Sequence, residues 1–237
     1  MNESKRQYYE AYEERYKTAH RMGVSWMSAQ STPIVKEILG KYRILLCETL
    51  LEIGCGEGRD ARVLLEEGYN LLASDLSREA IDYCKETMPA YASHFQVMDC
   101  LTDDSNKLFD FIYSVAVIHM LVRDQDRKGF YQFIYRHLKP GGISLICTMG
   151  DGIHEMQSDI RQAFDLQERD HPSGKMQVAA TSCRMVSFET FGKELDENGF
   201  YILEKGITDS LPDFDSLMYA VAKKRTDQIT GEIYAQS

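Results

Sequence analysis

The sequence lacks the compositional extremes of disordered, fibrous or repeat proteins. No low-complexity tract and no internal repeat interrupts the 237 residues, of which 43% are hydrophobic and 27% are charged. Such a chain has enough apolar surface to offset the entropy lost on folding. Its length suits one substantial core with an appended element, so we expect one globular unit with disorder only at the ends.

Long apolar runs are also missing. The longest nearly uncharged stretch, Phe111 to Val122, is far shorter than the ~20 residues that a membrane-spanning helix needs. The opening residues, MNESKRQYYE, lack the apolar segment of a signal peptide. We therefore expect a cytoplasmic protein that makes no membrane contact.

Disulfide and metal-binding spacings are absent too. No two cysteines form a C-x-x-C pair, which argues against a disulfide scaffold or a zinc ribbon. His154, Glu155 and Asp159 are close in sequence but form no H-E-x-x-H pattern, so no metal is expected. We expect mostly buried free thiols at Cys47, Cys55, Cys84, Cys100, Cys147 and Cys183.

Positive charge is scarce, and the formal net charge is -10. The average surface therefore repels phosphate, and no nucleic-acid partner is expected. The only dense basic run, residues 223–225, is interpreted as a solvated strand end. A monomer and a homodimer both remain open.

The first 45 or so residues have a helical pattern. Tyr8, Tyr12 and Tyr16 recur at a spacing of four on one helix face, which is typical of packing. Ser31-Thr32-Pro33 then provides an N-cap and an early proline for a second helix. Residues 1–45 are therefore predicted to form an N-terminal helical cap.

Short apolar runs alternate with helical segments from Thr49 onward, which predicts parallel βαβ units over residues 46–148. The K-P-G-G sequence at 139–142 is interpreted as a turn into the fifth strand. The predicted strands are LLEIG, YNLLASD, HFQVMD, FDFIYSVA and GISLICTM, and the predicted helices are residues 60–67, 78–88 and 126–138.

The last third of the chain changes pattern twice. Residues 149–186 lose the alternation and are predicted to be an insertion, after which Ser187 can cap a helix that ends near Gly199. FYILEKG and SLMYAVAKK are strand-like and flank Leu211-Pro212-Asp213, which predicts a C-terminal hairpin within residues 187–225. Residues 226–237 are predicted to form a loose tail.

The strongest motif is the glycine-rich turn in LEIGCGEG, which follows a predicted strand and precedes a helix. Gly54 and Gly56 permit unusual backbone angles and close approach of a ligand. The glycines follow a G-x-G-x-G spacing, whereas dinucleotide sites use G-x-G-x-x-G. Glu52 and Glu57 flank the turn and suit a cofactor with positive charge and no phosphate. A sulfonium cofactor therefore fits better than a dinucleotide.

An acidic residue follows at the expected place. Asp75 ends the second predicted strand, 75 − 54 = 21 positions after the first glycine of the turn. A carboxylate there accepts hydrogen bonds from ribose hydroxyls. The strand, the turn, the helix and this acid together predict a ribose-bearing cofactor.

With these residues the chain resembles the class I S-adenosylmethionine-dependent methyltransferases, whose first motif reads E-x-G-x-G-x-G. The resemblance runs from about Thr49 to Thr148, and more loosely to Arg225. The L-x-x-G-C-G-x-G-R pattern is similar to that of bacterial small-molecule enzymes such as the tellurite-resistance and thiopurine methyltransferase groups.

The resemblance implies the roles of several residues. The glycine turn contacts the methionine part of S-adenosylmethionine, Asp75 holds the ribose, Asp99 and Cys100 lie beside the adenine, and the segment from Val115 to His119 passes near the reactive methyl. The implied cofactor-binding residues are Glu52, Gly54, Cys55, Gly56, Gly58, Asp75, Leu76, Asp99, Cys100, Ser114 and Val115.

The methyl acceptor is less well defined by the sequence. Methyl transfer from a sulfonium needs alignment and desolvation, and it needs a base only where the acceptor must lose a proton. His119 is the candidate catalytic base, because it follows the fourth strand at the carboxyl ends where ligands bind; a hydrogen-bonded packing residue is the alternative. The candidate substrate contacts are Tyr16, Arg21, Trp26, His119, His154 and Arg184.

We therefore predict an α/β fold with a Rossmann-like seven-stranded, mostly parallel sheet, an antiparallel edge hairpin, helices on both faces and an N-terminal helical cap. Residues 149–186 are predicted to form a lid on the acceptor side. The predicted function is methyl transfer from S-adenosylmethionine to a small molecule. A nucleic-acid or protein methyltransferase and a non-catalytic S-adenosylmethionine-binding module remain alternatives, while the glycine spacing opposes a dehydrogenase.

Overall fold

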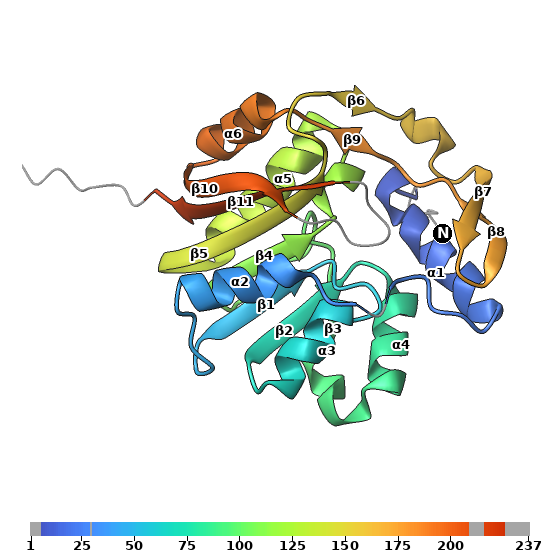
Figure 1. Ribbon diagram of the computed structural model, residues 1–237, viewed down its shortest axis with the longest axis horizontal. Coiled ribbons are helices and arrows are strands. Elements are labelled where there is room, and N and C mark those ends of the chain that lie inside the picture. Colours follow the sequence, from blue (N-terminus) through green and yellow to red (C-terminus); the bar gives the residue numbers. More distant parts are fainter. Residues whose placement is uncertain (1–5, 29, 209–215, 226–237) are drawn as a thin grey trace, which may run out of the picture.

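The computed structural model describes residues 6–28, 30–208 and 216–225 and is built around a seven-stranded sheet (Figure 1). The strand order is β10-β11-β5-β4-β1-β2-β3, and only β11 runs against the others. The predicted Rossmann-like, mostly parallel sheet is confirmed. Its strands are β1 (Thr49–Ile53), β2 (Asn70–Asp75), β3 (Phe95–Val97), β4 (Phe109–Val115), β5 (Leu138–Met149), β10 (Phe200–Thr208) and β11 (Leu217–Lys224).

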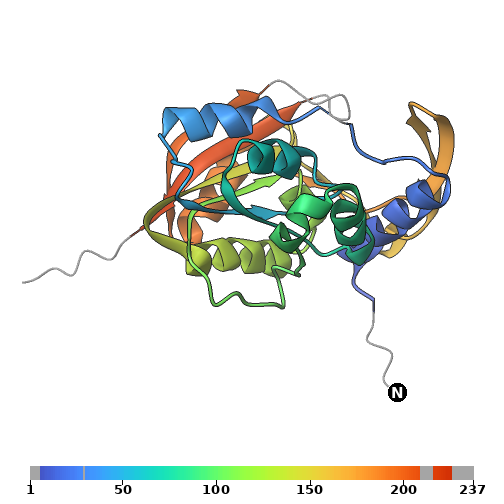
Figure 2. The same ribbon diagram turned by 90° about the horizontal axis from the view of Figure 1, so that it is seen from below.

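Helices cover both faces of the sheet (Figure 2). Side chains alternate along each strand, so Leu50 and Phe111 pack on one face while Leu51 and Ile112 pack on the other. Burial on both faces explains why these strands read as nearly continuous apolar runs. One face is covered by α2 (Pro33–Lys41), α3 (Arg59–Glu66) and α4 (Arg78–Thr87), and the other by α5 (Asp124–His137) and α6 (Phe188–Glu197).

The C-terminal hairpin is present as β10 and β11, which pair antiparallel. The hydroxyl of Ser187 accepts a hydrogen bond from the backbone N of Thr190 at 3.2 Å, so it caps α6 as predicted. The predicted turn at Leu211-Pro212-Asp213 and the predicted loose tail at 226–237 lie outside the described residues.

The K-P-G-G sequence forms a bulge within β5 rather than a turn before it. Phe109 of β4 pairs with Leu138, whereas Phe111 pairs with Ile143. The residues between the two partners, 139–142, therefore loop out of the ladder. The result is a local bend that precedes the fully buried part of the strand.

Residues 149–186 contain more regular structure than the sequence indicated. Besides β6 (Met156–Gln157), η4 (Ile160–Gln162) and β9 (Arg184–Met185), they form a hairpin of β7 (Leu166–His171) and β8 (Gly174–Ala179). No side chain of β7 is fully buried, so its sequence, LQERDH, has no alternation to reveal a strand.

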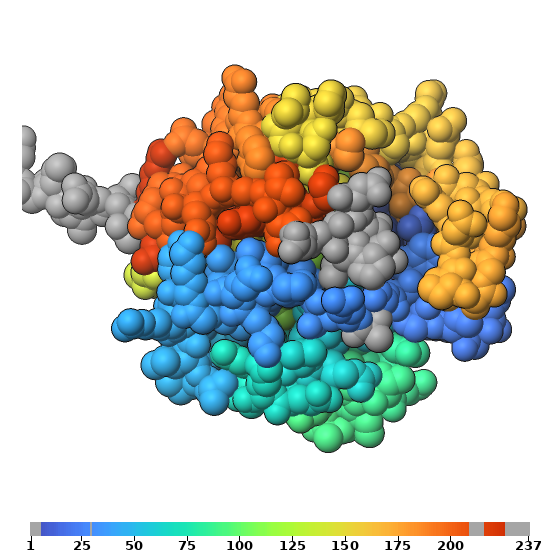
Figure 3. Space-filling model, in the orientation of Figure 1, coloured from blue at the N-terminus to red at the C-terminus, as the bar shows by residue number. Residues whose placement is uncertain are grey.

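The β7–β8 hairpin lies beside α1 (Ala11–Arg21), away from the main sheet (Figures 1 and 3). Ala19 of α1 forms a small apolar cluster with Met176 and Val178 of β8. Contacts between residues more than 150 positions apart therefore join the N-terminal helix and the insertion into one unit at the end of the sheet.

The segment between α1 and α2 is tied to the core by polar contacts. Pro33 occupies the first turn of α2, as predicted. Thr32 has the extended backbone of an N-cap residue, but its hydroxyl donates to Asp60 of α3 at 2.7 Å and does not cap the helix. None of the helices in the described part of the chain has the length and apolarity needed to span a membrane.

Candidate functional site

A cavity of about 900 Å³ opens at the carboxyl ends of β1, β2, β3 and β4. Gly54, Asp75, Asp99 and Ala116 each follow or end one of these strands, and all four line the cavity. The opposite wall comes from α1 and the β7–β8 hairpin. Open α/β sheets bind their ligands at this edge, and the volume is at the upper end of the usual range for ligand pockets.

Each glycine of the turn has a left-handed backbone. Gly54, Gly56 and Gly58 have φ values of +76°, +54° and +80°. A methyl group on Gly56 would lie 2.5 Å from the sulfur of Met27 and 2.6 Å from the hydroxyl of Tyr16. The absence of side chains therefore serves two needs, since it permits the turn and lets the N-terminal segment pack directly on it.

Asp75 is held against this turn by two backbone groups. Its carboxylate accepts hydrogen bonds from the backbone N of Gly56 at 2.8 Å and of Ser77 at 2.7 Å. Burial raises the pKa of Asp75 to about 6, and these two hydrogen bonds oppose the shift. The carboxylate lines the cavity with capacity to accept further hydrogen bonds.

Glu52 and Arg59 lie beside the turn and carry polar atoms that no other group satisfies. Oε2 of Glu52 and both Nε and Nη1 of Arg59 are buried, with no hydrogen-bond partner among the described residues. Buried polar atoms are rarely left in this condition. A ligand with an ammonium and a carboxylate on one carbon, as in the methionine part of S-adenosylmethionine, offers partners for both side chains.

The charge of Glu52 differs from the sequence-based interpretation. Burial, with the neighbouring Asp60 carboxylate, raises the pKa of Glu52 to about 8. In the free protein this carboxyl is therefore mostly protonated at neutral pH, and it is not the fixed negative charge that the sequence suggested. Arg59 lowers this pKa, and an ammonium placed nearby would lower it further.

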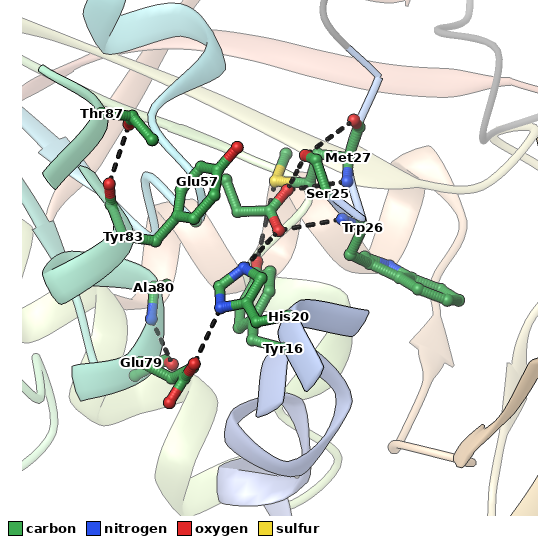
Figure 4. A network of polar contacts seen from close by, with 12 residues as sticks. Tyr16, His20, Ser25, Trp26, Met27, Glu57, Glu79, Ala80, Tyr83 and Thr87 are labelled. Carbon is green, nitrogen blue, oxygen red and sulfur yellow. Dashed lines mark hydrogen bonds and ion pairs between the residues drawn. The ribbon is translucent and has the colours of Figure 1, made fainter. Parts of the chain in front are cut away.

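Glu57 does not face the cavity, which corrects the interpretation of this residue as part of the cofactor's electrostatic environment. Its carboxylate accepts hydrogen bonds from the backbone N of Trp26 at 2.9 Å and of Met27 at 2.8 Å, and it contacts His20 Nε2 at 2.8 Å (Figure 4). His20 Nδ1 in turn contacts Glu79 of α4 at 2.8 Å. Glu57 therefore fastens the N-terminal segment to the glycine turn.

The predicted cofactor-binding residues fall into two groups. Six of them line the cavity: Gly54, Asp75, Leu76, Asp99, Cys100 and Val115. The remaining five are buried directly behind its wall: Glu52, Cys55, Gly56, Gly58 and Ser114.

His119 lines the cavity just after β4 and is only 3% exposed. Burial lowers its pKa to about 3, and the positive charges of Arg127 and Arg15 lower it further. The imidazole is therefore neutral at physiological pH and is a weak base. These features favour a hydrogen-bonding wall residue over the predicted general base.

Aromatic side chains form the wall opposite the sheet. Tyr16 of α1 is buried and lines the cavity together with Trp26, as the sequence predicted for substrate contacts. The ring of His171 from the β7–β8 hairpin stacks on Trp26, with centroids 5.9 Å apart. The N-terminal segment and the hairpin thus share one aromatic surface.

Three predicted substrate contacts are not brought to the cavity. Arg21 is exposed on α1, and His154 is exposed and pairs with Asp151 at 2.5 Å. Arg184 donates to the backbone O of Val122 at 2.8 Å and so fastens β9 to the start of α5. None of the three lines the cavity.

Sequence reasoning missed Arg15, which is 5% exposed and does line the cavity. Arg15 is three positions after Tyr12, so the two are neighbours on the helix surface. Arg21, six positions further on, is exposed. The tyrosine spacing alone does not bury Arg15, because its partners are the backbone oxygens of Ala179 and Ala180 at the end of the β7–β8 hairpin.

The six cysteines are free thiols, but only Cys55, Cys84 and Cys147 are buried. Cys100 and Cys183 are half-buried at the cavity, and Cys47 is exposed. The expectation of mostly buried thiols therefore holds for half of them. Within residues 6–28, 30–208 and 216–225, no three His, Cys, Asp or Glu side chains cluster closely enough to hold a metal ion.

Sheet order, glycine turn and strand-end acids together define a class of protein: the class I methyltransferase fold. Residues 50–142 match the family model described as "Methyltransferase domain". Over these residues the chain has a methyltransferase domain of the class I, S-adenosylmethionine-dependent kind.

Curated relatives agree with this assignment over the core. The chain is 30% identical over 122 residues to a ubiquinone biosynthesis O-methyltransferase of Rickettsia canadensis, covering 49% of each chain. It is 32% identical over 117 residues to a cypemycin N-terminal methyltransferase of a Streptomyces species, covering 46% of each. The chain thus spans about half the length of the curated relatives it matches.

Solved structures share the fold over most of the chain. A 1,6-didemethyltoxoflavin N1-methyltransferase of Burkholderia thailandensis, with bound S-adenosylhomocysteine, has a TM-score of 0.67 at 15% identity and covers 89% of this chain and 85% of its own. A TehB-like methyltransferase of Corynebacterium glutamicum has a TM-score of 0.55 at 18% identity, covering 91% and 97%. These structures extend the likeness beyond the core.

Proposed function

We propose that this protein transfers a methyl group from S-adenosylmethionine to a small-molecule acceptor. The observation that carries the proposal is the cavity itself, which joins the glycine turn and Asp75 to an enclosed space under α1 and the β7–β8 hairpin. The donor supplies a sulfonium methyl: the acceptor's electron pair forms a bond to that carbon while the carbon–sulfur bond breaks, leaving neutral S-adenosylhomocysteine.

Each end of the donor has proposed partners in this chain. We assign the ribose hydroxyls to the Asp75 carboxylate and the adenine to the wall made by Asp99 and Cys100. The methionine carboxylate is assigned to Arg59 and its ammonium to Glu52, because their unsatisfied buried atoms have the matching chemistry. Binding there would satisfy polar atoms that are costly to leave unpaired.

The N-terminal cap (residues 1–45) and the insertion (residues 149–186) are proposed to enclose the acceptor. Aromatic side chains of both line the cavity and exclude water from the reacting atoms. Neutral His119 is proposed to position the acceptor by hydrogen bonding. An amine or thiolate acceptor needs no more than this alignment.

A small acceptor is favoured by the enclosed cavity and by the acidic surface, which repels nucleic acid. Free thiols agree with the cytoplasm as the proposed location. An O-methyltransferase and an N-terminal methyltransferase are both similar to this chain, so the methylated atom is left to experiment.

Calorimetric titration with S-adenosylmethionine and S-adenosylhomocysteine tests the donor site. Asp75→Ala is expected to weaken binding about 10- to 100-fold, since hydrogen bonds to a charged group contribute roughly 1.5–3 kcal/mol. Asp82→Ala, at an exposed position of α4, is the matched control and is expected to bind as the wild type does. Absence of binding by the wild-type protein would overturn the proposal.

Turnover is tested by S-adenosylhomocysteine release with a panel of small amines, thiols, phenols and acids, beside an RNA and a peptide pool. Release with a small molecule supports the proposal. Release only with RNA or peptide would instead identify a macromolecular methyltransferase. Tight donor binding with no release across the panel would favour a non-catalytic binding module.

A further inference from the structure

Arg15 combines deep burial, a place on the cavity wall and an aromatic environment. Its guanidinium lies 4.7 Å from the ring centre of Tyr12 and 4.8 Å from that of Trp26. It donates to the backbone O of Ala179 at 2.5 Å and of Ala180 at 2.9 Å. These contacts hold the cation in one orientation at the junction of α1 and the hairpin.

The neighbours of Arg15 satisfy hydrogen bonds but do not neutralise its charge. Within residues 6–28, 30–208 and 216–225, no carboxylate lies within ion-pair distance of it. Arg127, another deeply buried arginine, is instead paired with the carboxylate of Glu194 in α6 at 2.6 Å. Buried charges are ordinarily paired, because desolvation of a lone ion is costly.

A second arginine adds its positive charge to the unpaired charge of Arg15. Arg169 of β7 also lines the cavity, and its charge repels that of Arg15 and lowers the Arg15 pKa after burial has done so. Three acids also line this side of the cavity: Glu168 pairs with Lys175 and Asp159 pairs with Arg161, each at 2.5 Å, while Asp170 is exposed and next to Arg169 in sequence. The hairpin side of the cavity thus presents two guanidinium groups in a protein of net charge -10.

We infer that the methyl acceptor carries a carboxylate, which Arg15 and Arg169 bind on the hairpin side of the cavity. The inference rests on the proposed function, because it names the acceptor class of the same site. Two guanidinium groups suit a carboxylate geometrically as well as electrostatically. The aromatic wall formed by Tyr12, Trp26 and His171 accommodates the apolar part of the same molecule.

The carboxylate of the donor does not account for these two arginines. Arg59 lies at the start of α3, beside the glycine turn, and its unsatisfied nitrogens are proposed to take that group. Arg15 and Arg169 belong to the cap and the hairpin, on the opposite wall. The two ends of the cavity therefore bind two separate anionic groups.

Benzoate and benzamide serve as matched probes, since they differ in charge and hardly in shape. Each is titrated by calorimetry into the full-length protein saturated with S-adenosylhomocysteine. Benzoate is expected to bind at least about tenfold more tightly than benzamide, as charge-assisted hydrogen bonds exceed neutral ones. No benzoate binding, or equal affinity for the two probes, would overturn the inference.

Arginine variants show which side chains cause the preference for benzoate over benzamide. Arg15→Gln and Arg169→Gln are each expected to reduce the acid-over-amide ratio to below about threefold, whereas Arg21→Gln, an exposed position on the same helix, keeps it. Arg15→Lys retains the positive charge and is expected to keep a preference. If Arg15→Gln does not fold, the exposed Arg169 still decides the question, and an unchanged ratio in Arg169→Gln would count against the inference.

S-adenosylhomocysteine affinity separates this inference from the proposed function. It is expected to be unchanged in all of these variants, and a loss in Arg15→Gln would assign Arg15 to the donor and overturn the inference. If the wild-type protein fails to bind S-adenosylhomocysteine, the proposed function falls. The benzoate and benzamide titrations are then made on the free protein, where the acid preference stands or falls by itself.

Discussion

The two walls of the cavity are built in different ways. On the donor side, the glycine turn, Asp75 and Asp99 come from one run of about fifty residues in which each strand places the next side chain at the same sheet edge. On the proposed acceptor side, α1 and the β7–β8 hairpin are separated by 166 − 21 = 145 positions in the sequence. The residues of the first wall are close together in the sequence, whereas those of the second come together only when the chain folds.

The two walls also differ in burial. The glycine turn is buried, and substituents on its glycines would clash with Met27, Val117 or Met88. Most of the β7–β8 hairpin is exposed and packs through Met176, Val178 and Ala179. A tightly packed donor wall tolerates little change, whereas a thinly packed acceptor wall can vary at small cost in stability. The comparison therefore predicts large effects on the donor side and small ones on the hairpin.

The largest effect is expected for Arg59→Met. Loss of the proposed partner of the methionine carboxylate should weaken S-adenosylmethionine binding about 100-fold, or roughly 2.7 kcal/mol. Arg62→Met, an exposed position of α3, is the control and should bind normally. Calorimetry on both folded variants is the measurement. Equal affinities would remove Arg59 from the donor wall.

Gly56→Ala tests packing of the cap on the turn, and we expect an effect of similar size on the free energy of unfolding. The left-handed backbone costs an alanine about 1–2 kcal/mol, and displacing Met27 and Tyr16 adds about 1–3 kcal/mol. Gly68→Ala has the same backbone strain, with φ +88°, but open space around it. Urea unfolding measures both, and similar losses for the two would show that the contact with the cap contributes little.

A change in pH should affect the donor wall to an intermediate degree. Burial raises the pKa of Asp75 to about 6, so the free protein holds a proton there below that pH. Ribose hydroxyls donate to the ionised form, and its ionisation should therefore raise affinity for S-adenosylhomocysteine about tenfold from pH 5 to pH 7. Asp75→Asn should remove the rise, and a dependence that survives this substitution would point to another group.

The raised pKa of Asp75 also affects the stability of the free protein, which changes with pH in the opposite direction to ligand affinity. Between about pH 4 and pH 6 the folded state retains a proton that the unfolded chain has released. This group therefore lowers the free energy of unfolding as pH rises through that range. Chemical unfolding of the wild type and of Asp75→Asn, compared at pH 4 and pH 6.5, measures the contribution.

The smallest effect is expected for Lys175→Ala on the hairpin. Lys175 pairs with Glu168, but the side chains are 68% and 50% exposed. Exposed pairs typically contribute between 0 and about 1 kcal/mol, and salt screens them. Thermal unfolding should therefore be almost unchanged. A large loss would mean that the hairpin is integral to the core, and the contrast between the two walls would fail.

Some of the site could be predicted from the sequence, because its signals are local. The strand, turn and helix around Gly54 and the acid that ends β2 follow from residues that are neighbours along the chain. Six of the eleven predicted cofactor residues line the cavity, and the other five lie behind its wall. The charge of Glu52 was misjudged because burial raises its pKa, and the placement of Glu57 was misjudged because its carboxylate binds the N-terminal segment.

The acceptor wall could not be predicted, because no local pattern encodes it. Strand β7 is nearly all polar and presents no buried face, so its sequence is that of a loop. Arg15 is on the side of α1 that meets the hairpin and is buried, whereas Arg21 is exposed. The predicted contacts Arg21, His154 and Arg184 were wrong in placement for the same reason, since each found solvent or a different partner.

The sequence alone determined the class of fold and the position of the donor turn, because strand and helix periods and glycine conformations are properties of neighbouring residues. Only the tertiary structure decided which charges are buried, which are paired and which arginine lines the cavity. Those outcomes depend on desolvation and on contacts between residues more than 150 positions apart, and neither is written in any one segment of the chain.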